Sequence, residues 1–123
     1  MVTFLSEYVN DTYKTKLNII FVYISEAHAT DIWPIGMSAG TLNSSHKIIG
    51  DRIRCAKKMI DTYGFIIPTY VDTMTNNYRD TYSAWPFRAY GFKNGKIVYK
   101  SGIKNSEYDP IELCDAITDM IKT

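Results

Sequence analysis

The chain has 123 residues and a formal net charge of +1, from 14 basic and 13 acidic side chains mixed along its length. Hydrophobic residues make up 46% and charged residues 22%, which suits one soluble domain over residues 1–123 with a single core. No basic stripe or cluster is present that would bind nucleic acid or an acidic membrane surface, so we expect neither as a partner.

The cysteines and the apolar runs exclude further classes of protein. Cys55 and Cys114 lie far apart without a CxxC, so they predict neither a disulfide framework nor a zinc motif. The longest apolar run, residues 19–24, is too short to cross a bilayer, and the first residues lack the pattern of a secretory signal. We therefore expect a cytoplasmic chain without a metal or resident cofactor.

The first half of the chain alternates helix and strand patterns. Apolar spacing predicts a helix over residues 2–13, although no capping residue precedes it. The β-branched and aromatic run 16–24 predicts a strand buried on both faces, and a polar loop follows over 25–47. A second helix is expected over 48–64, where Gly64 provides the stop. Its predicted apolar face consists of Ile49, Ile53, Ala56, Met59, Ile60 and Tyr63.

The second half predicts another strand, a short helix, a hairpin and a closing helix, over residues 65–72, 75–85, 87–102 and 109–122. Asn94 and Gly95 suit the tight turn of the hairpin. Asp109 followed by Pro110 suits the start of the last helix. The predicted buried stripe of that helix consists of Ile111, Leu113, Cys114, Ile117, Met120 and Ile121.

The predicted element order is therefore α-β-α-β-α-β-β-α. Helices between the early strands imply parallel crossovers, and a hairpin with a helix closes the unit. This order indicates an α/β domain, a thioredoxin-like three-layer sandwich that is N-terminally incomplete.

Six segments resemble the iodothyronine deiodinases, in the same order along the chain. They are FVYISEAHATDIW (21–33), HKIIGDR (46–52), VDTMTNN (71–77), YSAWPFR (82–88), GKIVYK (95–100) and YDPIEL (108–113). The resemblance covers nearly the whole chain. It implies a thioredoxin fold that is related to peroxiredoxin-like proteins.

The resemblance also implies where the catalytic nucleophile belongs. In the family a selenocysteine or cysteine stands at the start of a helix, whose N-terminus favours the anionic form. That residue comes a few positions before the segment that matches residues 1–9 here. We therefore expect this chain to lack the nucleophile and the strand before it, and to be inactive as it stands. A thiol reductant and a small-molecule substrate are expected only if the nucleophile is restored.

The resemblance makes Glu26, His28 and His46 catalytic residues. The first two follow a central strand, where open α/β sheets bind ligands. A histidine suits the delivery of a proton to a ring carbon that loses iodine. The alternative for Glu26 and His28 is an ordinary polar loop, and the alternative for His46 is a solvated residue before a helix.

Four further residues are expected to bind substrate: Trp33, Tyr82, Pro86 and Arg88. By the resemblance, Pro86 is the proline that is cis in thioredoxin folds. Arg88 matches a family arginine, although Phe87 replaces the acid that precedes it in the family. The alternative for Tyr82 is core packing.

Two hypotheses for function result, with a weaker third. The first is a deiodinase-like oxidoreductase that performs selenol- or thiol-dependent reductive dehalogenation or peroxide reduction. The alternative is a non-catalytic thioredoxin-like binding or structural module, possibly a homodimer that fills the open sheet. The third uses Cys55 as a nucleophile, although its place at the border of an apolar face favours a half-buried structural thiol. The basic run 52–58 around it is interpreted as a solvated helix face. Asp51 and Arg52, which recur in the family, are interpreted as structural: an acid in the first turn of the helix and a partner for loop groups.

Overall fold

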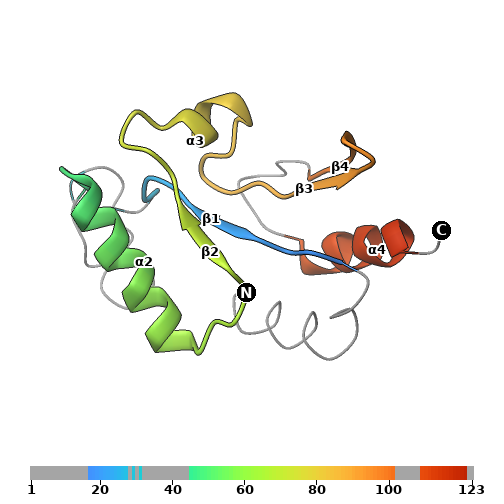
Figure 1. The fold of residues 1–123 in the computed structure, drawn as a ribbon, viewed down its shortest axis with the longest axis horizontal. Coiled ribbons are helices and arrows are strands. Elements are labelled where there is room, and N and C mark those ends of the chain that lie inside the picture. Colours follow the sequence, from blue (N-terminus) through green and yellow to red (C-terminus); the bar gives the residue numbers. More distant parts are fainter. Residues whose placement is uncertain (1–16, 28, 30, 32–44, 102–108, 122–123) are drawn as a thin grey trace.

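The structure is a computed structural model that describes residues 17–27, 29, 31, 45–101 and 109–121 (Figure 1). The predicted first helix, residues 2–13, lies outside the described residues. The described elements are β1 (Phe21–Tyr23), α2 (Ile49–Tyr63), β2 (Thr69–Val71), α3 (Asn77–Thr81), β3 (Tyr90–Lys93), β4 (Lys96–Lys100) and α4 (Pro110–Ile121). The mixed α/β class predicted from the sequence is confirmed.

Strands β1 and β2 form a parallel pair, with Val22 opposite Tyr70. Helix α2 connects them and lies along the pair in Figure 1, so the predicted parallel crossover is present. Both strands are shorter than the predicted ranges 16–24 and 65–72. The ladder begins where Phe21 N–H donates to the Pro68 carbonyl at 2.9 Å, and Pro68 itself has no N–H to extend it.

Strands β3 and β4 form the antiparallel hairpin expected from the sequence. Asn94 and Gly95 both have positive φ angles, 53° and 74°, which is the backbone that a two-residue hairpin turn requires. Among the described residues, the strands form two separate two-stranded sheets. Figure 1 shows the hairpin with α4 beside it, on the opposite side of β1 from α2.

Helix α2 begins and ends as predicted, and half of its predicted apolar face is confirmed: Ala56 is buried, and Met59 and Ile60 pack against the core. Ile49, Ile53 and Tyr63 were predicted to be buried and are instead 44%, 37% and 55% exposed. The buried positions are Arg52 and Ala56, one helical turn apart. The prediction failed at Ile49, Ile53 and Tyr63 because it chose the face by hydrophobicity alone, and the helix turns Arg52 inward.

The core is formed by side chains from α2, β1 and α4 and from the segment that follows α2. Phe65 and Ile67 are buried and pack with Ile19, Phe21, Met59, Ile60 and Leu113. The rings of Phe21 and Phe65 meet edge to face, with centroids 5.2 Å apart. These contacts fix the direction of β1, and therefore the position of the residues that follow it.

The two remaining helices differ from prediction in detail. Helix α3 ends at Thr81 and not at 85, and Ser83, with φ of 48°, cannot continue a right-handed helix. Helix α4 starts as predicted, since Asp109 Oδ1 accepts the backbone N–H groups of Ile111 and Glu112. The side chain of Ile111 is 71% exposed, so its predicted place in the buried stripe is wrong. None of the described helices combines the length and the apolar character needed to cross a membrane.

Candidate active site at the end of strand β1

Glu26 lies three residues beyond β1, and its side chain is 8% exposed. Tyr23, the last residue of β1, donates its hydroxyl to Glu26 Oε1 at 2.5 Å. Burial raises the pKa of Tyr23, and the neighbouring Glu26 carboxylate raises it further. The tyrosine is therefore a neutral donor that holds the carboxylate in place.

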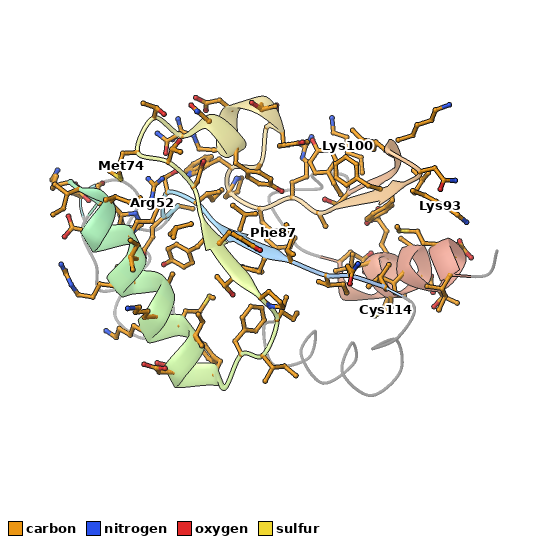
Figure 2. All side chains as sticks on the ribbon, in the orientation of Figure 1. Arg52, Met74, Phe87, Lys93, Lys100 and Cys114 are labelled. Carbon is orange, nitrogen blue, oxygen red and sulfur yellow. The ribbon has the colours of Figure 1, made fainter. Side chains whose placement is uncertain are left out.

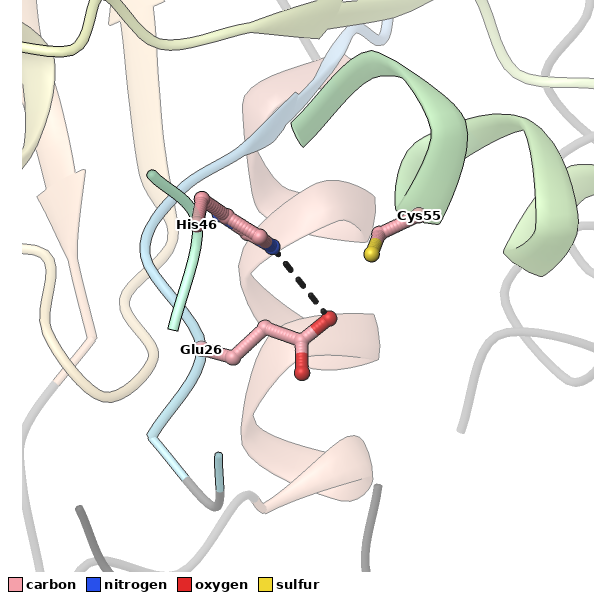
Figure 3. A group of neighbouring side chains, drawn as sticks. All are labelled: Glu26, His46 and Cys55. Carbon is pink, nitrogen blue, oxygen red and sulfur yellow. Dashed lines mark ion pairs between the residues drawn. The ribbon is translucent and has the colours of Figure 1, made fainter. Parts of the chain in front are cut away.

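His46 approaches the same carboxylate from the segment before α2, and its side chain is 2% exposed. Its Nε2 is 3.5 Å from Glu26 Oε1 (Figure 3), longer than an ordinary N–H···O hydrogen bond. Nε2 is buried and has no hydrogen-bond partner among the described residues. On the other side of the ring, Arg52 Nε donates to Nδ1 at 3.1 Å.

Arg52 is held behind His46 by the segment that follows β2. Its Nη1 donates to the carbonyls of Thr73 at 2.7 Å and Asp72 at 3.3 Å, and its Nη2 donates to Asn76 Oδ1 at 3.1 Å (Figure 2). The residue is 2% exposed, so the interpretation of the run 52–58 as a solvated face is wrong at this position, whereas the interpretation of Arg52 as a structural partner for loop groups is confirmed. The sequence does contain a clue, because Arg52 precedes Ala56 by four positions and shares its helix face.

Cys55 is the third side chain of the cluster (Figure 3). Its Sγ, a ring nitrogen of His46 and a carboxylate oxygen of Glu26 all lie within 4.8 Å of one another. Burial raises the pKa of the Cys55 thiol, and the charge of Glu26 and a hydrogen bond to it raise it further. The thiol is half-buried as predicted, and this environment keeps it protonated, which does not favour a nucleophile.

The structure brings together some of the predicted site residues and leaves others elsewhere. Glu26 and His46 meet directly. Tyr82 packs in an aromatic cluster, with ring centroids 4.8 Å from Tyr78 and 5.1 Å from Tyr90. His28 and Trp33 lie outside the described residues.

The last two predicted residues precede β3. The Trp85–Pro86 peptide bond is cis, as the resemblance implied. Arg88 is half-buried, and its Nε is a buried donor that has no hydrogen-bond partner among the described residues. Helix α3, which leads into this segment, is connected to the end of β1 because Arg79 Nη1 donates to Ser25 Oγ at 3.2 Å.

Three residues of the cluster were not predicted as site residues: Tyr23 was not considered, Arg52 was interpreted as structural, and Cys55 was considered as a nucleophile but interpreted as a structural thiol. Together with Glu26 and His46 they form a cluster in which hydrogen-bond donors surround the buried carboxylate of Glu26. The Arg52 cation lies on the other side of the His46 ring. Such an arrangement can hold a negative charge, orient hydrogen bonds and take part in proton transfer.

Comparison with known proteins shows the family to which this chain belongs. A family model described as iodothyronine deiodinase matches residues 4–119. The chain belongs to the iodothyronine deiodinase family. The family membership confirms the resemblance carried by the six sequence segments, and an oxidoreductase fits the family.

Individual deiodinases show how far the similarity extends. The chain is 32% identical to the type I iodothyronine deiodinase of Xenopus laevis over 100 residues, which cover 81% of this chain and 38% of that protein. It is 35% identical to the thyroxine 5-deiodinase of Aquarana catesbeiana over 86 residues, 69% of this chain and 31% of that protein. It is 29% identical to the thyroxine 5-deiodinase of Ovis aries over 101 residues, which cover 82% of this chain and 34% of that protein. The chain thus spans about a third of the length of these deiodinases.

Proposed function

We propose that the chain is part of a deiodinase-like oxidoreductase that performs selenol- or thiol-dependent reductive removal of iodine from an aromatic ring, or reduces a peroxide. Family membership supports the reaction class. The observation that carries the proposal further is the buried pair of Glu26 and His46, with the Nε2 of His46 open to an acceptor. A buried donor without a partner costs folding free energy, which indicates a functional reason for its position.

The proposal includes a thioredoxin-like, peroxiredoxin-like sandwich for the single domain of residues 1–123. Two features support it: the parallel β1–β2 pair connected by α2, and the β3–β4 hairpin followed by α4. In this arrangement the residues after β1 lie at the carboxyl end of a parallel strand, where ligands bind in open α/β sheets.

The proposed reaction needs one nucleophile, one proton and one reductant. The selenolate or thiolate implied by the family attacks iodine, the carbon–iodine bond breaks, and the electron pair stays on the ring carbon. That carbon takes up a proton, and a chalcogen–iodine bond forms. Two equivalents of a thiol then reduce this bond, which gives a disulfide, hydrogen iodide and the restored nucleophile.

Each predicted catalytic residue has a role in this scheme. His28 supplies the proton to the ring carbon. The Nε2 of His46 donates a hydrogen bond to the charge that develops in the site, where low exposure strengthens it. Glu26, held in place by the hydroxyl of Tyr23, orients the hydrogen-bond donors around it and takes part in proton transfer in the site.

The substrate-binding residues are proposed to lie along the segment from α3 to β3. Tyr82 offers an aromatic face that an iodinated ring can pack against, and Pro86 lies in the same segment. Trp33 is proposed as a further aromatic residue for substrate binding. The buried Nε of Arg88 is a charged donor that suits an anionic group of the substrate. Iodothyronines combine both features, and the relatives of this chain include a type I iodothyronine deiodinase and a thyroxine 5-deiodinase.

The test is iodide release from an iodothyronine, with a dithiol reductant, by the protein expressed from its natural gene. We expect Glu26→Gln to lower kcat/KM by about 100-fold or more, the range of general acid–base catalysis. Glu112→Gln is the matched control, because Glu112 also accepts a tyrosine hydroxyl, from Tyr99 at 3.3 Å, and lies on α4. Equal activities of the two variants would overturn the proposed role of Glu26.

A further inference from the structure

The hydrogen bond between Arg52 and His46 determines which ring nitrogen carries a proton. A guanidinium group has five donors and no acceptor. Because Arg52 Nε donates to His46 Nδ1 at 3.1 Å, Nδ1 must offer its lone pair. The neutral imidazole then carries its single proton on Nε2.

Arg52 cannot easily turn away from this contact. Its two other nitrogens are engaged by the carbonyls of Asp72 and Thr73 and by the side chain of Asn76. The side chain lies on α2, and its acceptors lie on the segment after β2, so the contact spans two elements (Figure 2). A guanidinium group also remains charged at every physiological pH. The donor facing Nδ1 is therefore fixed in both position and protonation.

The protonated Nε2 points into the cluster with Glu26 and Cys55 (Figure 3). It is buried, and it has no hydrogen-bond partner in the described part of the chain. The imidazole thus connects the Arg52 cation on one side with the Glu26 carboxylate, 3.5 Å from Nε2, on the other. A neutral imidazole in this arrangement donates a hydrogen bond from Nε2 but keeps that proton. It would lose the proton only if Nδ1 gained one in exchange, and the guanidinium group that faces Nδ1 is too weak an acid to supply it.

We infer that Arg52 is a positioning residue that holds His46 as the neutral Nε2–H tautomer, a hydrogen-bond donor that cannot ligate a metal. Carboxylate, imidazole and thiol are the ligand types of zinc, and these three lie close enough to suggest such a site. A metal would take the lone pair of Nε2 and move the ring proton to Nδ1, against the N–H of Arg52. Metal-bound histidines instead donate that second N–H to an acceptor.

The consequence for catalysis rests on the proposed function. If the site performs reductive dehalogenation, Arg52 assigns the two histidines different tasks: His46 stabilises developing charge, and His28 delivers the proton. The tautomer itself needs no turnover, so it can be tested on the protein whether or not that function holds.

The experiment is ¹⁵N NMR of the histidine side chains in the ¹⁵N-labelled protein. With only two histidines in the chain, a His28→Ala variant assigns the signals of His46. We expect a pyrrole-type, proton-bearing Nε2 and a pyridine-type Nδ1, with a scalar coupling across the hydrogen bond from Arg52 Nε to Nδ1. A proton on Nδ1 would overturn the inference, as would a spectrum in which added Zn²⁺ binds at His46 Nε2.

A pair of arginine variants separates positioning from charge. Arg52→Met keeps the length of the side chain but removes the donor, and we expect His46 to show a mixture of both tautomers. Arg54→Met removes the same charge from a 74% exposed position on the same helix and should leave the single tautomer intact. A single Nε2–H tautomer in folded Arg52→Met would overturn the role of Arg52. If that variant does not fold, the wild-type spectrum and the Zn²⁺ titration decide.

Discussion

Glu26 is the residue around which the candidate site is organised. Tyr23 donates to it, the thiol of Cys55 donates to it, and the protonated nitrogen of His46 faces it. A carboxylate surrounded in this way acts on its titratable neighbours. Two predictions at the residue scale test this picture.

The first concerns the thiol of Cys55. Burial is the main reason for its raised pKa, and the charge of Glu26 adds to it. Removing that charge in Glu26→Gln should therefore lower the pKa and shift the pH profile of alkylation by iodoacetamide to lower pH. Mass spectrometry of the Cys55 peptide in a Cys114→Ser background measures the rate. A profile that stays in place or moves to higher pH would show that Glu26 does not act on this thiol.

The second concerns the buried guanidinium of Arg52. Removing it in Arg52→Met leaves the carbonyl of Thr73 and the side chain of Asn76 without their donor. The buried carbonyl of Asp72 loses its donor as well. We expect the free energy of unfolding in urea to fall by roughly 1–3 kcal/mol, the cost of one buried group without a partner. The exposed ion pair of Arg54 with Asp51 is worth little, so Arg54→Met should change stability by less than about 0.5 kcal/mol. Similar losses for the two variants would contradict the assigned contacts.

At the scale of elements, α2 positions two residues of the site, and its first turn is organised by Asp51. The Oδ2 of Asp51 accepts the backbone N–H of Lys47 at 2.9 Å and of Ile48 at 3.1 Å, next to His46. At the other end Gly64 adopts the left-handed backbone, with φ of 59°, that ends the helix. The helix is therefore fixed at both ends by local interactions.

The cap at Asp51 predicts a pH dependence of stability. The two backbone hydrogen bonds hold the pKa of Asp51 below its ordinary value of 3.8. A carboxyl group with a lower pKa in the folded state stabilises the fold above 3.8, and this contribution is lost as the pH falls below that value. The difference between wild-type and Asp51→Asn urea midpoints should be largest near neutral pH and shrink in acid. A difference that is constant with pH would exclude this cap as its source.

The contact between α4 and the hairpin depends on a glycine. A Cβ at Gly91 would lie 2.5 Å from Met120 Sδ and 3.1 Å from Tyr99 Cβ. We expect Gly91→Ala to lower the free energy of unfolding by roughly 1–3 kcal/mol, the usual cost of overpacking. In a Met120→Ala background the cost should fall by roughly 0.5–2 kcal/mol, because the closest atoms are gone. Urea unfolding of both pairs measures this cost. If Gly91→Ala lowers the free energy of unfolding equally in the wild-type and Met120→Ala backgrounds, the packing is refuted.

Local patterns predicted the elements well, and long-range contacts explain the errors. The Asn94–Gly95 turn, the end of α2 at Gly64 and the start of α4 at Asp109 depend on neighbouring residues and were found. The burial of Arg52 beside the site was not predicted, because its acceptors are about 20 residues further along the chain. The strands were predicted too long because only pairing with a partner determines where a ladder stops.

At the scale of the whole molecule, the site is assembled from segments that are far apart in the sequence. Residues 23–26, 46–55 and 72–76 meet where β1 and β2 end and α2 begins (Figure 1). The family resemblance predicted that Glu26 and His46 share a site, and the structure brings them together. The involvement of Tyr23, Arg52 and Cys55 follows only from the packing of α2 against the strands.

The proposed deiodinase-like activity is tested most simply by iodide release from an iodothyronine, with a dithiol as reductant. Two samples are compared: the protein expressed from its natural gene and the 123-residue chain produced alone. We expect iodide release by the natural protein and none by the 123-residue chain, because neither Cys55 nor Cys114 stands where the resemblance places the nucleophile. A folded natural protein that releases no iodide and reduces no peroxide would contradict the account.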